Sequence, residues 1–155
     1  MLTGEDRERY WTTTTDPDLP ADRWLTGMRT APVLVVVWTD QEAYLTRYAE
    51  PDKGWTDRDP GRWTAPYWWV DAGMAVLGML YAAVDDGLGA CFFGAPPDRI
   101  GALRRAYGVP EGQQLVGVLA LGVPDGAPRV TKRLRRPPRD LLHRGRWTPP
   151  PEAHS

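Results

Sequence analysis

The segment from Trp68 to Val84 constrains the fold of this chain more than any other part of the sequence. It is typical of a helix, and apolar side chains occupy every side of that helix. Such a helix is either buried all round or covered by a second subunit. Its unbroken apolar run, Gly73 to Val84, has 12 residues, whereas ~20 are needed to cross a bilayer. We therefore expect a soluble protein with no membrane partner, built as an obligate homodimer, or as a heterodimer with a homologue, around this helix.

Composition limits the class of protein further. The chain has 155 residues, enough for one domain with a real core. Its net charge of −1 gives no general attraction to nucleic acids or anionic membranes. Cys91 is the only cysteine, which excludes a disulfide framework and favours a reducing, cytoplasmic location. The opening MLTGEDRERYW lacks the basic start and apolar stretch of a signal peptide.

Apolar patterns predict three strands. PVLVVVWT (32–39) and QLVGVLALGV (114–123) are unbroken apolar runs, typical of strands that are covered on both faces. GACFF (89–93) is a shorter run of the same kind. Together with the central helix, these runs predict one mixed domain without internal repeats.

Capping signals predict two helices in the first third of the chain. Thr3 and Asp6 have the spacing of a capping box, which places a short helix at residues 3–11. Asp40 caps a second helix that Pro51 ends. Residues 12–31 between them are predicted as a connection with about one helical turn.

The remaining helix and loop follow the same logic. Residues 96–108 are predicted as a helix with prolines at its start and Gly108 past its end. The loop at 51–66 is polar yet holds Trp55 and Trp63, and a loop of this length in a compact domain is commonly functional or disordered.

The glycine-rich stretch DDGLGACFFG (85–94) admits two interpretations. Gly87 fits the left-handed position just past a helix, with Gly89 easing the turn into a strand. Alternatively, the bare backbone of this stretch faces a cofactor. A dinucleotide fingerprint is excluded, because Gly94 lies too late for the G-x-G-x-x-G spacing and the glycines follow a helix instead of opening one.

Other polar residues exclude several kinds of site. The two histidines, His143 and His154, lack further ligands at metal-site spacing, so no metal is expected. Ser155 is the only serine, which leaves no hydrolytic triad, and Cys91 lies in an apolar strand. The basic run near the C-terminus is either a solvated tail or a phosphate clamp, and nucleic acid is not an expected partner. This profile suits an enzyme whose chemistry belongs to an organic cofactor.

The order of the motifs resembles the nitroreductase family of flavin-dependent oxidoreductases. Three stretches carry the resemblance, which runs from about Asp6 to Trp147. They are APVLVVVW, the long stretch YWWVDAGMAVLGMLYAAVDDGLGACFFG with its continuation to LGVP, and the basic stretch that closes on LLHRGRW. It implies an α+β fold in one domain over residues 1–147, with a mainly antiparallel sheet flanked by helices. It also implies an intertwined homodimer that binds FMN at its subunit interfaces.

The resemblance also implies site residues. Backbone amides near the end of the strand after the glycine turn would contact the isoalloxazine ring, at Phe93 and Gly94 with Phe92 alongside. The FMN phosphate would be held by a basic arm at residues 129–147, through Lys132, Arg135 and Arg136. Two aromatic residues, Trp68 and Trp69, are candidates to stack on a flat substrate, and Trp55 and Trp63 are further ones.

One departure from the family bears on function. The family's arginine-rich N-terminal segment has no counterpart here, so we expect either a start codon that lies upstream or a shortened member of the family. A disordered tail is expected at 148–155. The resemblance implies an FMN-dependent NAD(P)H oxidoreductase that reduces nitroaromatics, quinones or similar flat acceptors in a ping-pong cycle. The alternative is a flavin-free or inactive subunit that pairs with a full-length homologue.

Overall fold

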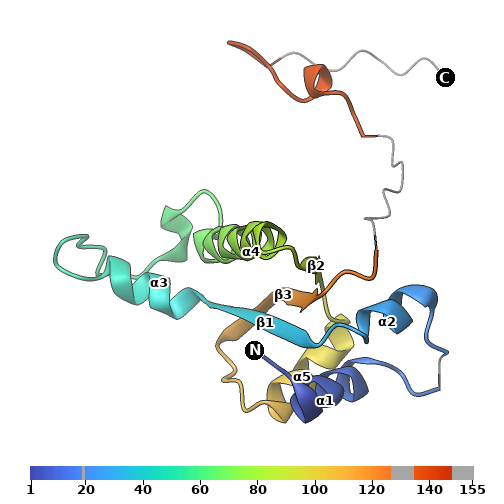
Figure 1. Cartoon of the computed structure of the whole chain (residues 1–155). Coiled ribbons are helices and arrows are strands. Elements are labelled where there is room, and N and C mark those ends of the chain that lie inside the picture. The colour runs from blue at the N-terminus through green and yellow to red at the C-terminus, as the bar shows by residue number, and fades with distance from the viewer. Residues whose placement is uncertain (19, 127–134, 148–155) are drawn as a thin grey trace. The chain divides into compact units, whose positions relative to one another are not determined.

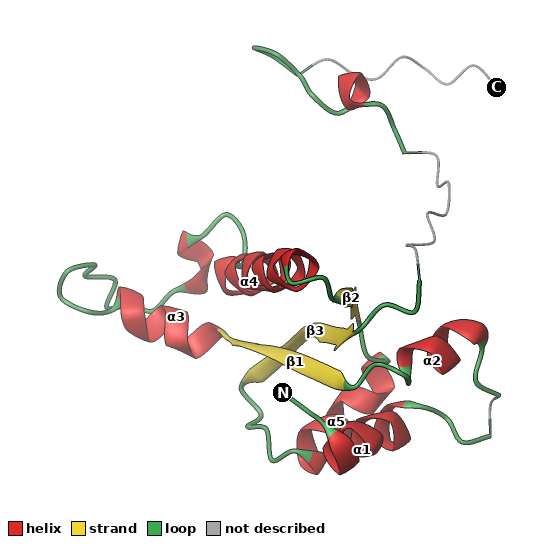
Figure 2. Ribbon diagram, in the orientation of Figure 1, coloured by secondary structure: helices red, strands yellow, loops and turns green. Residues whose placement is uncertain are grey.

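The computed structural model of this chain describes residues 1–18, 20–126 and 135–147. The chain divides into two compact units, Met1–Asp125 and Gly126–Ser155. The first unit contains the sheet and its helices (Figures 1 and 2). In the second unit the described residues form a single short 3-10 turn, η3 (Pro138–Asp140). The predicted tail at 148–155 lies outside the described residues.

The sheet of the first unit is antiparallel throughout. Within the described residues it has three strands in the order β1 (Val33–Asp40), β3 (Gln113–Gly122), β2 (Gly89–Phe93). All three predicted strands are confirmed to within one or two residues. The burial of β1 differs from the prediction, because an edge strand is only partly covered and just two of its residues, Leu34 and Thr39, are buried. The central position of β3 explains why its apolar run at Val118–Ala120 is almost completely buried.

Helices α1 (Gly4–Thr14), α2 (Arg23–Met28) and α5 (Ile100–Ala106) lie on one side of the sheet (Figure 1). Their apolar side chains and the facing strands form the core, which buries Tyr10, Trp11, Leu34, Leu103, Val118 and Ala120. Tyr10 and Trp11 come from α1, and Leu103 comes from α5. Burying each such side chain contributes about 1.5–3 kcal/mol, so this layer carries much of the stability of the unit.

The predicted capping box at the start of α1 is wrong. The Thr3 side chain makes no capping hydrogen bond. In a capping box the Thr3 hydroxyl would accept a hydrogen bond from the Asp6 amide. That amide donates instead to the Thr3 carbonyl at 3.2 Å. The helix also runs on to Thr14, and the hydroxyls of Thr13 and Thr14 donate back to carbonyls one turn earlier.

Helix α3 (Gln41–Tyr48) starts as predicted, since the Asp40 carboxylate accepts the Glu42 amide at 2.9 Å. The loop that follows contains the short 3-10 turn η1 (Pro60–Arg62). Its two tryptophans pack back on α3. The Trp55 and Trp63 rings each lie 5.0 Å from the Tyr48 ring and from one another. The loop is therefore anchored by an aromatic cluster.

Helix α4 (Tyr67–Asp85) covers the other face of the sheet (Figure 1). Only Trp68, Val76 and Ala83 are buried within this chain. The helix exposes an apolar face, whose most exposed large side chains are Tyr67, Val70, Met74, Leu77, Tyr81 and Val84. At 19 residues, α4 is the one described helix that is long and apolar enough to cross a membrane by length and composition. It is longer than the 12-residue apolar run because the helix also includes residues 67–72 and Asp85.

The glycine turn after α4 closes the helix in a Schellman arrangement. Gly87 has a φ of 74°, in the left-handed region. Its amide donates to the Val84 carbonyl at 3.0 Å, and the Leu88 amide donates to the Ala83 carbonyl at 2.8 Å. The first interpretation of Gly87 is thus confirmed. The prediction for residues 96–108 is also confirmed, by η2 (Pro97–Arg99), α5 and a left-handed Gly108.

Candidate functional site

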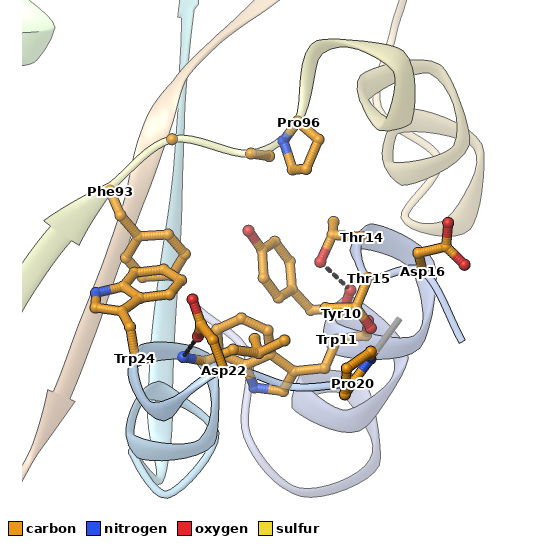
Figure 3. A pocket seen from close by; sticks show the side chains of 13 residues that line it. Tyr10, Trp11, Thr14, Thr15, Asp16, Pro20, Asp22, Trp24, Phe93 and Pro96 are labelled. Atoms are coloured by element: carbon orange, nitrogen blue, oxygen red, sulfur yellow. Dashed lines mark hydrogen bonds between the residues drawn. The ribbon is translucent and has the colours of Figure 1, made fainter. Parts of the chain in front are cut away.

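A pocket of about 560 Å³ lies where the end of β2 meets α1 and α2 (Figure 3). This volume is in the range of small-molecule sites in proteins. Thirteen residues line it: Tyr10, Trp11, Thr14, Thr15, Asp16, Pro20, Asp22, Trp24, Leu25, Phe93, Gly94, Ala95 and Pro96. The pocket therefore joins two regions that are far apart in the sequence, residues 10–25 and residues 93–96.

Aromatic rings form one wall of this pocket. The Trp11 and Phe93 rings are nearly parallel, with centroids 5.9 Å apart and an interplanar angle of 7°. The Trp24 ring meets Phe93 edge to face at 5.3 Å. Figure 3 shows the three rings together with Tyr10 on the same side of the pocket. A wall of this kind suits a flat, conjugated ligand.

Local structure fixes each of these rings. On β2, side chains alternate between the two faces of the sheet, which directs Phe93 toward α1 and α2. Trp24 is held at the start of α2, where the Asp22 carboxylate accepts the Leu25 amide at 2.7 Å. Arg7 of α1 donates to the Ala31 carbonyl at 2.9 Å, which ties α1 to the segment before β1.

The polar groups of the lining are acidic or neutral. Asp16 and Asp22 are its charged residues, and the described lining contains no lysine or arginine. Two cations lie just behind it. The Arg99 guanidinium is 3.9 Å from Asp16, and Arg29 donates to the Thr15 hydroxyl at 2.9 Å.

Tyr10 stays protonated over the physiological range. Burial raises the pKa of its phenol to about 12, because the charged form would lose its hydration. The Tyr10 side chain is 1% exposed. It therefore adds a neutral ring to the pocket and no negative charge.

The sequence profile of the nitroreductase family matches residues 6–123. That match spans most of the chain. The chain belongs to the nitroreductase family. The resemblance found from the motifs is thus confirmed, and membership indicates an oxidoreductase in general terms.

Solved structures agree with this nitroreductase assignment at the level of the fold. Nitroreductase CinD from Lactococcus lactis, in complex with nicotinic acid, has a TM-score of 0.66 at 23% sequence identity. The match covers 87% of this chain and 70% of that one. The nitroreductase-like family protein from Bacillus cereus has a TM-score of 0.55 at 21% identity, covering 91% and 68%. The comparison with curated proteins gives no match.

The structure brings together two of the residues that the nitroreductase resemblance suggested. Phe93 and Gly94 both line the pocket. A Cβ added at Gly94 would meet nothing within 4 Å, so the backbone there is open to a close approach. Phe92 points to the other face of the sheet, where its ring lies across Gly117 and is 40% exposed.

The two tryptophans proposed for substrate lie away from this pocket. Trp68 is buried and its carbonyl accepts the Thr39 hydroxyl at 2.7 Å. Trp69 donates from its indole nitrogen to the Gln114 side chain at 2.8 Å. Neither residue is among those that line the pocket in the described part of the chain. Their role in binding a substrate stays a prediction.

The predicted phosphate clamp belongs to the second unit. Arg136 donates to the Asp140 carbonyl at 2.8 Å, and Arg135 precedes it in the same segment. Lys132 lies outside the described residues. The clamp stays a prediction.

Sequence reasoning missed the residues that form most of the pocket wall. Tyr10 and Trp11 lie in the predicted helix, and Trp24 lies in a stretch that was predicted mainly as a connection. The available signal was three large aromatic side chains within otherwise polar segments, which is typical of rings that pack on a common surface. In the described residues no group of three or more metal-ligating side chains comes together.

The pocket fits one part of FMN and does not fit the other. Its flat aromatic wall and the open backbone at Gly94 suit the isoalloxazine ring. The phosphate would carry close to two negative charges, and the described lining offers it only Asp16 and Asp22 as charged groups. Cations for the phosphate would have to come from outside this lining.

Proposed function

We propose that this chain is an FMN-dependent NAD(P)H oxidoreductase that reduces flat aromatic acceptors. The observation that carries the proposal is the pocket at the end of β2, where Phe93, Gly94 and the aromatic wall meet in a member of the nitroreductase family. When bound, FMN supplies hydride-transfer chemistry, so that NAD(P)H and the acceptor would bind in turn in a ping-pong cycle. The protein's own part is to hold flat groups against Trp11 and Phe93 and to exclude water.

Nitroaromatics and quinones are the acceptors we propose. Structures of CinD are solved with chloramphenicol and with 4-nitrophenol, which supports a preference for aromatic ligands in proteins of this fold. In this chain, Trp24 is half exposed at the pocket and would stack on such a ring. Trp68 and Trp69 remain candidates where a partner subunit completes the site.

The direct test is anaerobic reduction of reconstituted flavin. Purified protein is mixed with FMN, and the flavin absorbance is followed after NADH or NADPH is added. We expect bleaching, and its reversal when 4-nitrophenol or a benzoquinone follows. Flavin that stays oxidised with both nucleotides would contradict the enzymatic proposal.

We propose that the phosphate is held by Lys132, Arg135 and Arg136 of the basic arm. Replacing Arg135 and Arg136 with alanine removes charge-assisted hydrogen bonds worth ~1.5–3 kcal/mol each, so FMN affinity should fall at least about tenfold. Riboflavin, which lacks the phosphate, is the control ligand and should bind both proteins equally. Equal FMN affinity in the two proteins would show that the arm does not hold the phosphate.

A second candidate function is supported by the charge of the pocket. Because the described lining has two carboxylates and no cation, a flavin-free subunit that pairs with a homologue is the alternative. The absorption spectrum separates the two candidates. Yellow protein, or protein that takes up added FMN, supports the enzyme, whereas protein that stays colourless with FMN supports the subunit.

The quaternary proposal is a homodimer, or a heterodimer with a homologue, built on α4. The exposed apolar face of that helix supports it, since several large side chains there remain uncovered in one chain. We further propose a cytoplasmic location, with small-molecule acceptors as ligands and neither nucleic acid nor membrane as partner.

A further inference from the structure

One corner of the pocket carries a negative charge that the described residues do not neutralise. Asp22 uses its Oδ1 oxygen to accept the Leu25 amide, and it forms no ion pair within the described part of the chain. Trp24 and Phe93 meet edge to face in the same corner. Asp22 and Trp24 are two residues apart at the start of α2, and both line the pocket (Figure 3).

The opposite end of the pocket is balanced. The Asp16 carboxylate lies 3.9 Å from the Arg99 guanidinium, and Arg29 donates to the hydroxyl of the adjacent Thr15. Two cations therefore lie near the Asp16 carboxylate. Tyr10 remains neutral, as described above. The surplus of negative charge therefore lies at Asp22, next to the most exposed ring of the pocket, Trp24, which is 49% exposed.

We propose that this corner of the pocket binds a flat aromatic cation, with its ring against Trp24 and its positive charge toward Asp22. The face of an indole attracts a cation within about 6 Å of its centre, and a carboxylate at the edge adds to that attraction. The ligand class is an N-alkylated heteroaromatic ring or a protonated arylamine. The inference rests on the proposed function only in that it names a ligand class for the same pocket.

Three probes of similar size and different charge test the inference by calorimetry with the full chain at pH 8. They are 1-methylquinolinium, neutral quinoline and anionic 2-naphthoate. We expect 1-methylquinolinium to bind about fivefold tighter than quinoline, and 2-naphthoate to bind most weakly. Naphthoate binding as tight as that of 1-methylquinolinium would overturn the inference.

Two variants locate the effect. Asp22→Asn keeps an oxygen that can cap α2 and removes the charge, so 1-methylquinolinium should weaken about fivefold while quinoline does not change. Trp24→Ala should weaken both probes. The matched control is Asp59→Asn, because Asp59 caps η1 in the same manner by accepting the Gly61 amide at 2.8 Å. If the Asp22→Asn and Asp59→Asn proteins bind 1-methylquinolinium equally tightly, the charge of Asp22 has no role in binding.

The two proposals fail in different ways. The probe titration measures binding without any reaction, so protein that never takes up FMN can still prefer the cation. Protein that reduces FMN and shows no dependence on probe charge would retain the proposed function and lose this inference. Far-ultraviolet circular dichroism of each variant checks that α2 and the rest of the fold are intact.

Discussion

Two glycines in this fold should respond to alanine in opposite directions. Gly87 lies in the left-handed region with a φ of 74°, where a Cβ costs roughly 1–2 kcal/mol. Gly101 lies inside α5, where the nearest atom to a new Cβ is the flexible end of Arg105 at 3.7 Å. We expect Gly87→Ala to lower the free energy of unfolding by about 1–2 kcal/mol and Gly101→Ala to raise it by about 0.5–1 kcal/mol. Urea denaturation measures both, and equal shifts would contradict the role of Gly87 in ending α4.

Tyr10 makes stability depend on alkaline pH. Its pKa is raised by burial to about 12, whereas an unfolded chain ionises near ~10. The stability that the buried neutral phenol of Tyr10 contributes is therefore fully present below pH ~10, and it is lost as the pH rises toward 12. Between these values we expect the wild type to lose about 2–3 kcal/mol more than Tyr10→Phe. The exposed Tyr81 offers the control variant Tyr81→Phe, which should follow the wild type; a Tyr10→Phe protein that does so would contradict the prediction.

At the scale of elements, the uncovered face of α4 decides the quaternary state. Met74 and Tyr81 are 65% and 69% exposed on that face. If a second subunit covers them, Met74→Glu with Tyr81→Glu places two charges in an apolar interface and should convert the dimer to a monomer at micromolar concentration. Sedimentation measures the mass, and Val123→Glu is the control at an exposed apolar residue outside α4. A wild type that sediments as a monomer, or that stays in the membrane fraction, would contradict the dimer.

The elements themselves were largely predictable from the sequence. The strands follow from unbroken apolar runs, and α3 follows from the Asp40 cap, because these signals act between neighbouring residues. The Thr3 box failed since a backbone carbonyl took the amide that the side chain was expected to accept. The partial exposure of β1 was not predictable either, because sequence pattern does not say which strand lies at the edge of the sheet.

At the scale of the whole molecule, the candidate site was predictable only in part. Phe93 and Gly94 were found because a family resemblance placed them, whereas Trp24 entered through the packing of α2 against the end of β2. Contacts of this kind join residues about 70 positions apart, and no local pattern encodes them. The charge of the pocket likewise became visible only when Asp16 and Asp22 came together in one lining.

The aromatic anchoring of the loop after α3 has a consequence for protease digestion. The loop contains three trypsin cleavage residues, and each is engaged. Lys53 lies 5.6 Å from the Tyr48 ring, Arg58 pairs with Glu42, and Arg62 pairs with Asp57. A protease needs an extended, movable segment, so native protein should be cut slowly here. Trp63→Ala, which removes the centre of the cluster, should make this loop one of the first places cleaved, as mass spectrometry of timed digests would reveal, whereas Trp24→Ala should leave its cleavage rate unchanged.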